Sequence, residues 1–140
     1  METISGQGPS RSIVWSLRAD RTAPARARAA INRPPLDRLD PAVRETIALL
    51  LSELVTNSVR HAGLTGTDEI ECRIAAGEVI RVEVRDPGPG YRPAPAAARA
   101  DSSGGWGLLI VDRLASRWGV RGARPACVWF ELDRDGMSSC

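Results

Sequence analysis

The first regular pattern along the chain is a stretch in which every second residue is large and apolar, which is the period of a half-buried β-strand. Ile13, Trp15 and Leu17 occupy these positions within residues 13–18. The same alternation returns in residues 78–86, where the apolar positions alternate with charged ones. Composition and turn residues predict three further strands, at 69–75, 118–122 and 127–133.

Helical patterns occupy three other segments. Residues 22–32 are rich in alanine and arginine, with Thr22 as a possible cap. The longest helix is predicted from Pro41 to about residue 62, with Asp40 at its N-cap. A third helix is predicted at about 106–117. On a helical wheel, the apolar residues of the longest helix share one broad arc: Val43, Ile47, Leu50, Leu51, Leu54 and Val55.

The order of these elements predicts the fold class. Strand, helix, helix, strand, strand, loop, helix, strand and strand would give a mixed, mostly antiparallel sheet with helices on one face. This is an α/β two-layer sandwich. Residues 1–12 are polar and rich in glycine and serine, which predicts a flexible N-terminal tail. One domain is therefore expected over 13–133, with a short C-terminal tail at 134–140.

Composition narrows the classes of function. The chain has 140 residues, 43% of them hydrophobic, and a formal net charge of +2, which fits one domain with a real core. Charges of both signs are interspersed, which argues against direct nucleic-acid binding. All basic residues other than the one histidine are arginines, so a P-loop, which needs a lysine, is excluded. No apolar run reaches the roughly 20 residues of a membrane span.

The cysteines point to the compartment. Cys72, Cys127 and Cys140 show no metal-ligand spacing, and their number is odd. We interpret them as reduced thiols of a cytoplasmic protein, since no signal peptide is evident.

The longest helix carries three polar residues at four-residue intervals, Glu53, Asn57 and His61. On the wheel, Glu53 and Asn57 lie at the edge of the apolar arc, which predicts a place at the rim of the buried face. A carboxylate and a carboxamide one turn apart offer oxygen ligands that suit Mg²⁺. The alternative is that both side chains only hydrogen-bond to neighbouring loops.

An aspartate ends the strand at 78–86. Asp86 continues the inward-facing positions of this strand, and an unpaired buried carboxylate is costly. The residues that follow include Gly88 and Gly90, which leave room for close approach to the backbone. Asp86 could therefore accept a hydrogen bond from an exocyclic amine such as that of adenine. A tight Asp-Pro-Gly turn is the alternative.

Glycines cluster before the third helix, in the segment SSGGWGLLI. Gly104, Gly105 and Gly107 lie where the free N–H groups and dipole of a helix start favour an anion. The same glycines could instead serve as a hinge for the preceding loop.

Taken together, these three motifs resemble the Bergerat-type ATP-binding fold, which gyrases, a class of heat-shock chaperones, histidine kinases and mismatch-repair proteins share. Within it, the chain is similar to the stand-alone bacterial anti-sigma factor serine/threonine kinases. The segments that carry the resemblance are SELVTNSVRHA, VEVRDPGPG and GGWGLLIVDRLASRWGV. The resemblance extends over about residues 13–133 and implies a histidine-kinase-like ATPase fold.

The resemblance also implies roles for individual residues. Asn57 would ligate Mg²⁺, and Glu53 would be the general base toward a serine hydroxyl. Asp86 would bind the adenine amine, in a pocket shaped by Gly88 and Gly90.

The rest of the implied site comes from the third motif. Gly105 and Gly107, followed by Leu108, would bring backbone amides to the phosphates of ATP. Residues 91–104 would form a lid over the nucleotide, and His61 would have a structural place beside the site.

The partners implied by the resemblance are a sigma factor, held inactive by this protein, and an anti-sigma antagonist that is phosphorylated on serine. Such proteins act in the bacterial cytoplasm, and a homodimer is possible. Relatives often carry threonine near adenine where Cys127 stands here, and a thiol is a weaker hydrogen-bond partner.

Two other functions stay open. One is a non-catalytic binding module of the same fold, which Cys127 favours, whereas Glu53 and Asn57 favour the kinase. The other is a detached histidine-kinase catalytic domain, which would phosphorylate a histidine of its partner.

Overall fold

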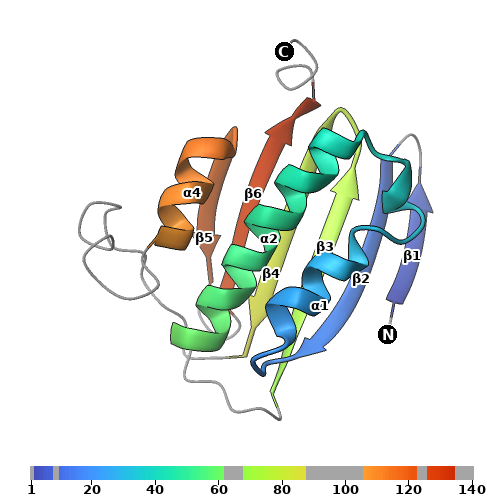
Figure 1. The fold of residues 1–140 in the computed structure, drawn as a ribbon. Coiled ribbons are helices and arrows are strands. Elements are labelled where there is room, and N and C mark those ends of the chain that lie inside the picture. The colour runs from blue at the N-terminus through green and yellow to red at the C-terminus, as the bar shows by residue number, and fades with distance from the viewer. Residues whose placement is uncertain (1, 8–9, 62–67, 88–105, 123–125, 135–140) are drawn as a thin grey trace.

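The computed structural model describes residues 2–7, 10–61, 68–87, 106–122 and 126–134. In chain order, these residues form β1 (Glu2–Gln7), β2 (Ser10–Arg18), α1 (Ala23–Ala30), the 3-10 turn η1 (Leu36–Arg38), α2 (Pro41–His61), β3 (Glu69–Ala76), β4 (Val79–Asp86), α4 (Trp106–Leu114), β5 (Arg117–Arg121) and β6 (Ala126–Asp133). Figure 1 shows their arrangement.

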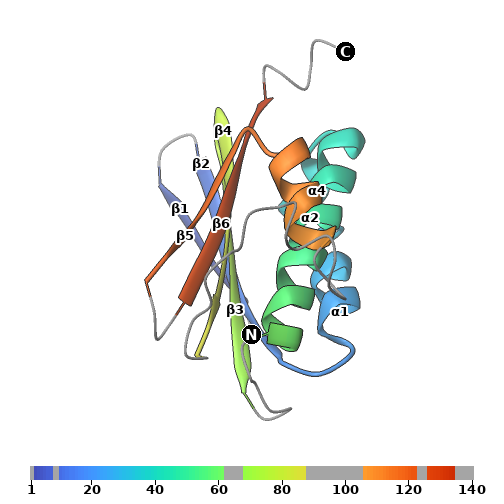
Figure 2. The same cartoon turned by 90° about the vertical axis from the view of Figure 1, so that its left-hand side faces the viewer.

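The strands form one sheet in the order β1-β2-β3-β4-β6-β5, and each pair of neighbouring strands is antiparallel. Helices α1, α2 and α4 cover one face of this sheet (Figure 2). The predicted two-layer α/β sandwich is therefore confirmed. Helix α2 crosses the middle of the sheet between the other two helices (Figure 1).

The N-terminal residues differ from the prediction. Where a flexible tail is expected over 1–12, residues Glu2–Gln7 form strand β1 and pair with Ser10–Trp15 of β2. The segment lacks the apolar alternation of a half-buried strand, so its composition gives no strand signal. An edge strand can nevertheless form through main-chain hydrogen bonds to its one neighbour.

Helices α1 and α2 begin close to the predicted residues, but only α2 is capped by the predicted side chain. The Ala42 amide donates to Asp40 Oδ1 at 2.9 Å, so Asp40 caps α2 as predicted. Thr22 occupies the N-cap position of α1, but its side chain does not bond the helix. Instead, its amide and its hydroxyl both donate to Asp20 Oδ1.

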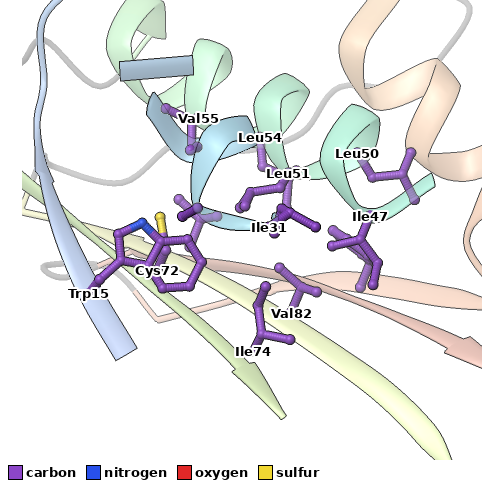
Figure 3. Close-up of a cluster of buried hydrophobic side chains, with 14 of the residues drawn as sticks. Trp15, Ile31, Ile47, Leu50, Leu51, Leu54, Val55, Cys72, Ile74 and Val82 are labelled. Atoms are coloured by element: carbon purple, nitrogen blue, oxygen red, sulfur yellow. The ribbon is translucent and has the colours of Figure 1, made fainter. Parts of the chain in front are cut away.

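The core lies between α2 and the sheet, as the wheel predicts. Ile47, Leu50, Leu51, Leu54 and Val55 are all fully buried, and Figure 3 shows α2 packed over side chains of the sheet such as Trp15, Cys72 and Val82. Burial of each such side chain contributes about 1.5–3 kcal/mol. This packing fixes the rotation of α2, and with it the direction of the polar residues near its C-terminal end.

No helix within the described ranges is long and apolar enough to cross a membrane.

Candidate functional site

Three segments meet at one end of the molecule. The C-terminal end of α2, the end of β4 and the beginning of α4 all lie toward the same end of the sheet (Figure 1). Each carries one of the three motifs singled out in the sequence. The fold therefore brings together motifs that are about 30 and 20 residues apart along the chain.

A buried hydrogen bond joins the first two segments. Ser58 Oγ on α2 donates to Asp86 Oδ2 on β4 at 2.9 Å. Ser58 and Asp86 are each only 1% exposed. A hydrogen bond to a charged group is worth about 1.5–3 kcal/mol, so this contact both offsets part of the cost of burying the carboxylate and fixes its position.

The direction of Asp86 follows from the register of its strand. Ile80, Val82, Val84 and Asp86 all face the helices and are buried. The predicted inward position of the aspartate is thus confirmed.

Asn57 lies deeper than predicted. Its side chain is 1% exposed, whereas the wheel places it at the rim of the buried face. The expectation is wrong because the last turns of α2 are packed in the interior: Ser58, the next residue, bonds Asp86 of β4, and both residues are as buried as Asn57.

The carboxamide of Asn57 is also incompletely satisfied. Its Nδ2 atom is buried and has no hydrogen-bond partner among the described residues. Leaving such a donor unpaired costs about 1–3 kcal/mol. Buried polar groups of folded proteins nearly all have a hydrogen-bond partner, so the unpaired Nδ2 atom of Asn57 calls for an explanation.

Glu53 lies one turn before Asn57 on α2 and is half-buried. Within the described part of the chain, its carboxylate has neither a hydrogen-bond nor an ion-pair partner. The side chain therefore remains available at the same end of the helix.

The side-chain oxygen of Asn57 is of a kind that ligates Mg²⁺, and the carboxylate of Glu53, one turn before it, could act either as a second ligand or as a base. Mg²⁺ in nucleotide sites takes one or two protein oxygens and completes its octahedron with phosphates and water. Asn57 and Glu53 offer one carboxamide and one carboxylate. No cluster of three or more His, Cys, Asp or Glu side chains that could hold a metal occurs in the described ranges.

The glycine motifs are only partly described. Helix α4 begins at Trp106, so Gly107 and Leu108 lie in its first turn, where backbone N–H groups lack helical partners. This agrees with the predicted helix start. Gly88, Gly90, Gly105 and the predicted lid at 91–104 lie outside the described residues, as does the side chain of His61.

The place predicted for Cys127 is wrong. In the register of β4 and β6, Cys127 pairs with Arg85, while Asp86 pairs with Ala126. Because successive residues of a strand face opposite sides of the sheet, the thiol lies on the face away from Asp86. Its Sγ atom is 4.0 Å from Glu83 Oε1. A shift of one residue in register moves a side chain to the other face of the sheet. Comparing Cys127 with the threonine of relatives by its place in the motif does not reveal the register, so it misplaces this side chain.

That other face of the sheet carries an ionic network. Glu83 is only 8% exposed and contacts Arg81 at 2.8 Å, Arg85 at 3.3 Å and Arg121 at 3.6 Å. Burial alone would raise the pKa of Glu83, but the hydrogen bond and charge of Arg81, together with Arg85 and Arg121, lower it. Arg81 also stacks on the Trp129 ring, 4.3 Å from its centroid. This network belongs to the face opposite the candidate site.

Sequence reasoning missed Ser58. The sequence does contain a signal for it. Ser58 lies seven residues after Leu51 and four after Leu54, so the helical wheel places its hydroxyl on the buried apolar arc. A polar residue at a predicted core position needs a partner, and Asp86 is that partner here.

Comparison with known proteins gives one family and several solved structures. The family described as "Histidine kinase-like ATPase domain" matches residues 16–132. No match is found among curated protein sequences.

Among solved structures, the RsbU and RsbW domains of Rv1364c from Mycobacterium tuberculosis are similar, with a TM-score of 0.62 and 21% identity over 86% of this chain. The blue-light activated histidine kinase of Erythrobacter litoralis EL346 matches with a TM-score of 0.56 and 23% identity over 83% of this chain. Its histidine kinase domain matches with a TM-score of 0.53 and 22% identity over 84% of this chain.

These likenesses establish the fold. The chain spans 32%, 42% and 62% of the three solved chains, in the same order.

Proposed function

Because the chain belongs to the histidine kinase-like ATPase domain family, we propose that it binds ATP and Mg²⁺ between the end of α2, the end of β4 and the start of α4. The observation that carries this proposal is the buried pair Ser58–Asp86 beside the unsatisfied amide of Asn57. These groups are costly to bury, and a ligand with complementary donors and acceptors offsets that cost.

Asp86 is the residue that would recognise the base. Its carboxylate would accept a hydrogen bond from the exocyclic amine of adenine. The hydrogen bond from Ser58 Oγ to Asp86 Oδ2, 2.9 Å long, holds this carboxylate in place. Gly88 and Gly90 would shape the pocket around the ring. Guanine carries a carbonyl at the corresponding position, so a carboxylate there would repel it, and the site would prefer ATP to GTP.

The phosphates would lie toward α4. Asn57 would ligate the metal, and Gly105, Gly107 and Leu108 would present backbone amides at the helix start. When bound, Mg²⁺ neutralises phosphate charge during transfer. The chain's own contribution is to hold the nucleotide and the acceptor in line.

We further infer that the protein is a serine/threonine kinase and an anti-sigma factor. Glu53 would take the proton from the hydroxyl of a serine on an antagonist protein. The unmodified antagonist would bind the kinase and release the sigma factor, and phosphorylation would reverse this exchange. The support is the resemblance of all three motifs to anti-sigma kinases and the fold shared with a chain that contains an RsbW domain. A homodimer is part of the same proposal.

The non-catalytic binding module loses its main support. It is favoured by a thiol beside the base, and Cys127 lies on the other face of the sheet. A half-buried, unpaired Glu53 at the proposed site favours catalysis instead.

A phosphate-transfer assay tests the catalytic proposal. The purified protein would be incubated with γ-labelled ATP and candidate antagonists, and the label would be tested for stability in acid. Acid-stable label on serine is expected, with a loss of at least about a hundredfold in Glu53→Gln. Glu45→Gln is the matched control, because Glu45 lies on the same helix and is exposed. Acid-labile label would assign a histidine acceptor, and equal loss in both variants would remove Glu53 from the mechanism.

A further inference from the structure

An open groove runs between α1 and α2, which lie side by side on one face of the sheet (Figure 1). Its volume is about 530 Å³. Arg44, in the first turns of α2, donates to the side-chain oxygen of Asn32, just after α1, at 3.3 Å. The end of α1 therefore lies beside the start of α2, and the two helices run antiparallel. No other element of the described ranges lies over them on the side away from the sheet (Figure 2).

Both walls of the groove follow the helical repeat. On α2 the lining positions are 41, 44, 45 and 48, and on α1 they are 25, 28 and 29, followed by residue 32 in the turn after the helix. Residues at such intervals share one face of a helix, so the groove is about two turns, or roughly 10 Å, long. Ala25, Ala29 and Ala48 are exposed or half-buried parts of this lining. Their small side chains leave room for larger apolar groups from outside.

The segment that forms the groove carries the positive charge of the whole chain. Residues 18–45 contain seven arginines and four acidic residues, a net charge of +3, whereas the chain as a whole has +2. The remainder of the chain therefore has a net charge of −1. A local excess of one sign attracts partners of the opposite sign.

The arginines of the groove are not neutralised within the molecule. Arg28 has neither a hydrogen-bond nor an ion-pair partner in the part of the chain that the structure describes. Arg44 bonds the Leu39 carbonyl through Nε and Asn32 through Nη1, and neither acceptor carries a charge. On the opposite face of the sheet, by contrast, Arg81 contacts the carboxylate of Glu131 at 2.9 Å. The charge of the groove is therefore available to a partner.

We propose that this groove is the docking site of an acidic, amphipathic helix of a partner protein. Apolar side chains of that helix lie against the three alanines, and its carboxylates pair with Arg28 and Arg44. A helix that enters a groove in this way uses apolar anchors at i, i+3, i+4 and i+7, which matches a groove of two turns. Glu45 lines the same groove, so the acids of the partner lie against Arg28 on the α1 side.

The groove contains none of the residues of the proposed nucleotide site, so the proposal is tested on the whole protein without nucleotide. The probe is a fluorescent, blocked helical peptide of about 15 residues, with leucines four residues apart on one face and glutamates beside them. Fluorescence anisotropy should give a saturable curve with a Kd below about 1 mM. A peptide with glutamine in place of each glutamate should bind at least about fivefold more weakly.

Two pairs of variants locate the peptide on the protein. Arg28→Glu and Arg113→Glu change the net charge equally, and both residues are exposed in the last turn of a helix. Only Arg28→Glu should weaken binding, by at least about fivefold. Ala25→Glu places a carboxylate in the groove, whereas Ala42→Glu places one at an exposed position of α2 that does not line it. Only Ala25→Glu should weaken binding. Urea denaturation verifies that each variant is as stable as the wild type.

Four results would overturn the proposal. A curve that does not saturate would show that no site exists, and equal binding of the glutamine peptide would show that charge plays no part. Equal binding of a glutamate peptide that has alanine in place of leucine would show attraction to charge alone, without the groove. Equal losses in Arg28→Glu and Arg113→Glu would place the peptide elsewhere. If sedimentation shows a dimer that the peptide dissociates, the groove belongs to a second copy of the chain, and the partner helix is wrong.

Discussion

Replacing Ser58 by alanine tests whether the hydrogen bond to Asp86 organises the site. The hydroxyl donates to a carboxylate at 2.9 Å, and both residues are 1% exposed. Removal leaves a buried carboxylate with one donor fewer, which costs about 1.5–3 kcal/mol. A loss of about 2 kcal/mol corresponds to a fall in Tm of roughly 6–10 °C for a domain of this size.

Ser52→Ala is the matched control. Ser52 is buried on the same helix, but its hydroxyl donates only to the Leu49 carbonyl at 2.9 Å. That carbonyl lies within the helix, where it also serves the main-chain ladder, so the loss should be below about 1 kcal/mol.

Urea denaturation of Ser58→Ala, of Asp86→Asn and of the double variant gives the coupling between the two groups, and Ser52→Ala is measured in the same way. The hydrogen bond predicts a coupling of more than about 1 kcal/mol, since residues in contact are not additive. A cost of Ser58→Ala no larger than that of Ser52→Ala, or a coupling near zero, would show that this hydrogen bond does not stabilise the buried carboxylate of Asp86.

Three further predictions concern the core and the opposite face of the sheet. Leu51→Ala should lower the free energy of unfolding by about 2–5 kcal/mol, while Leu49→Ala, at a position 40% exposed, should change it by less than about 1 kcal/mol in the same urea titration. Arg81 and its neighbours lower the pKa of Glu83, so the stabilisation is fully present above the unfolded-state pKa and is lost as pH falls through the folded one. The stability difference between the wild type and Glu83→Gln should therefore be largest near neutral pH and shrink below about pH 4.5, and a constant difference would contradict this. Burial, aided by the charge of Glu71, raises the pKa of Cys72 to about 12, so iodoacetamide at pH 8 should label Cys72 only in denaturant, as peptide mass mapping would show.

Periodicity predicted most of the fold, because the buried faces of α2 and β4 follow directly from the spacing of their apolar residues. Leu50, Leu54, Val82 and Val84 are buried where the pattern places them. Strand β1 escaped prediction because main-chain pairing leaves no trace in side-chain composition. Helix α1 was predicted with Thr22 at its N-cap position, but the Thr22 hydroxyl donates to Asp20 and does not bond the helix.

The candidate site was predicted less completely than the fold. The inward direction of Asp86 follows from strand parity alone. The burial of Asn57 does not follow from the helical wheel, because it depends on tertiary packing around the last turns of α2. The partner of Ser58 and the face on which Cys127 lies could not be predicted, because both depend on which strand residue lies opposite in the folded protein.

Calorimetric titration with ATP and ADP tests most directly whether Asp86 and Asn57 belong to a site for ATP and Mg²⁺. The wild type should bind both nucleotides, with ATP binding dependent on Mg²⁺. Asp86→Asn should weaken binding by about 10- to 150-fold, as the loss of a charged hydrogen bond predicts. Asp37→Asn, at an exposed position on η1, should bind as the wild type does. No heat of binding at millimolar nucleotide, or equal affinity in Asp86→Asn and the wild type, would show that the protein does not bind nucleotide through Asp86.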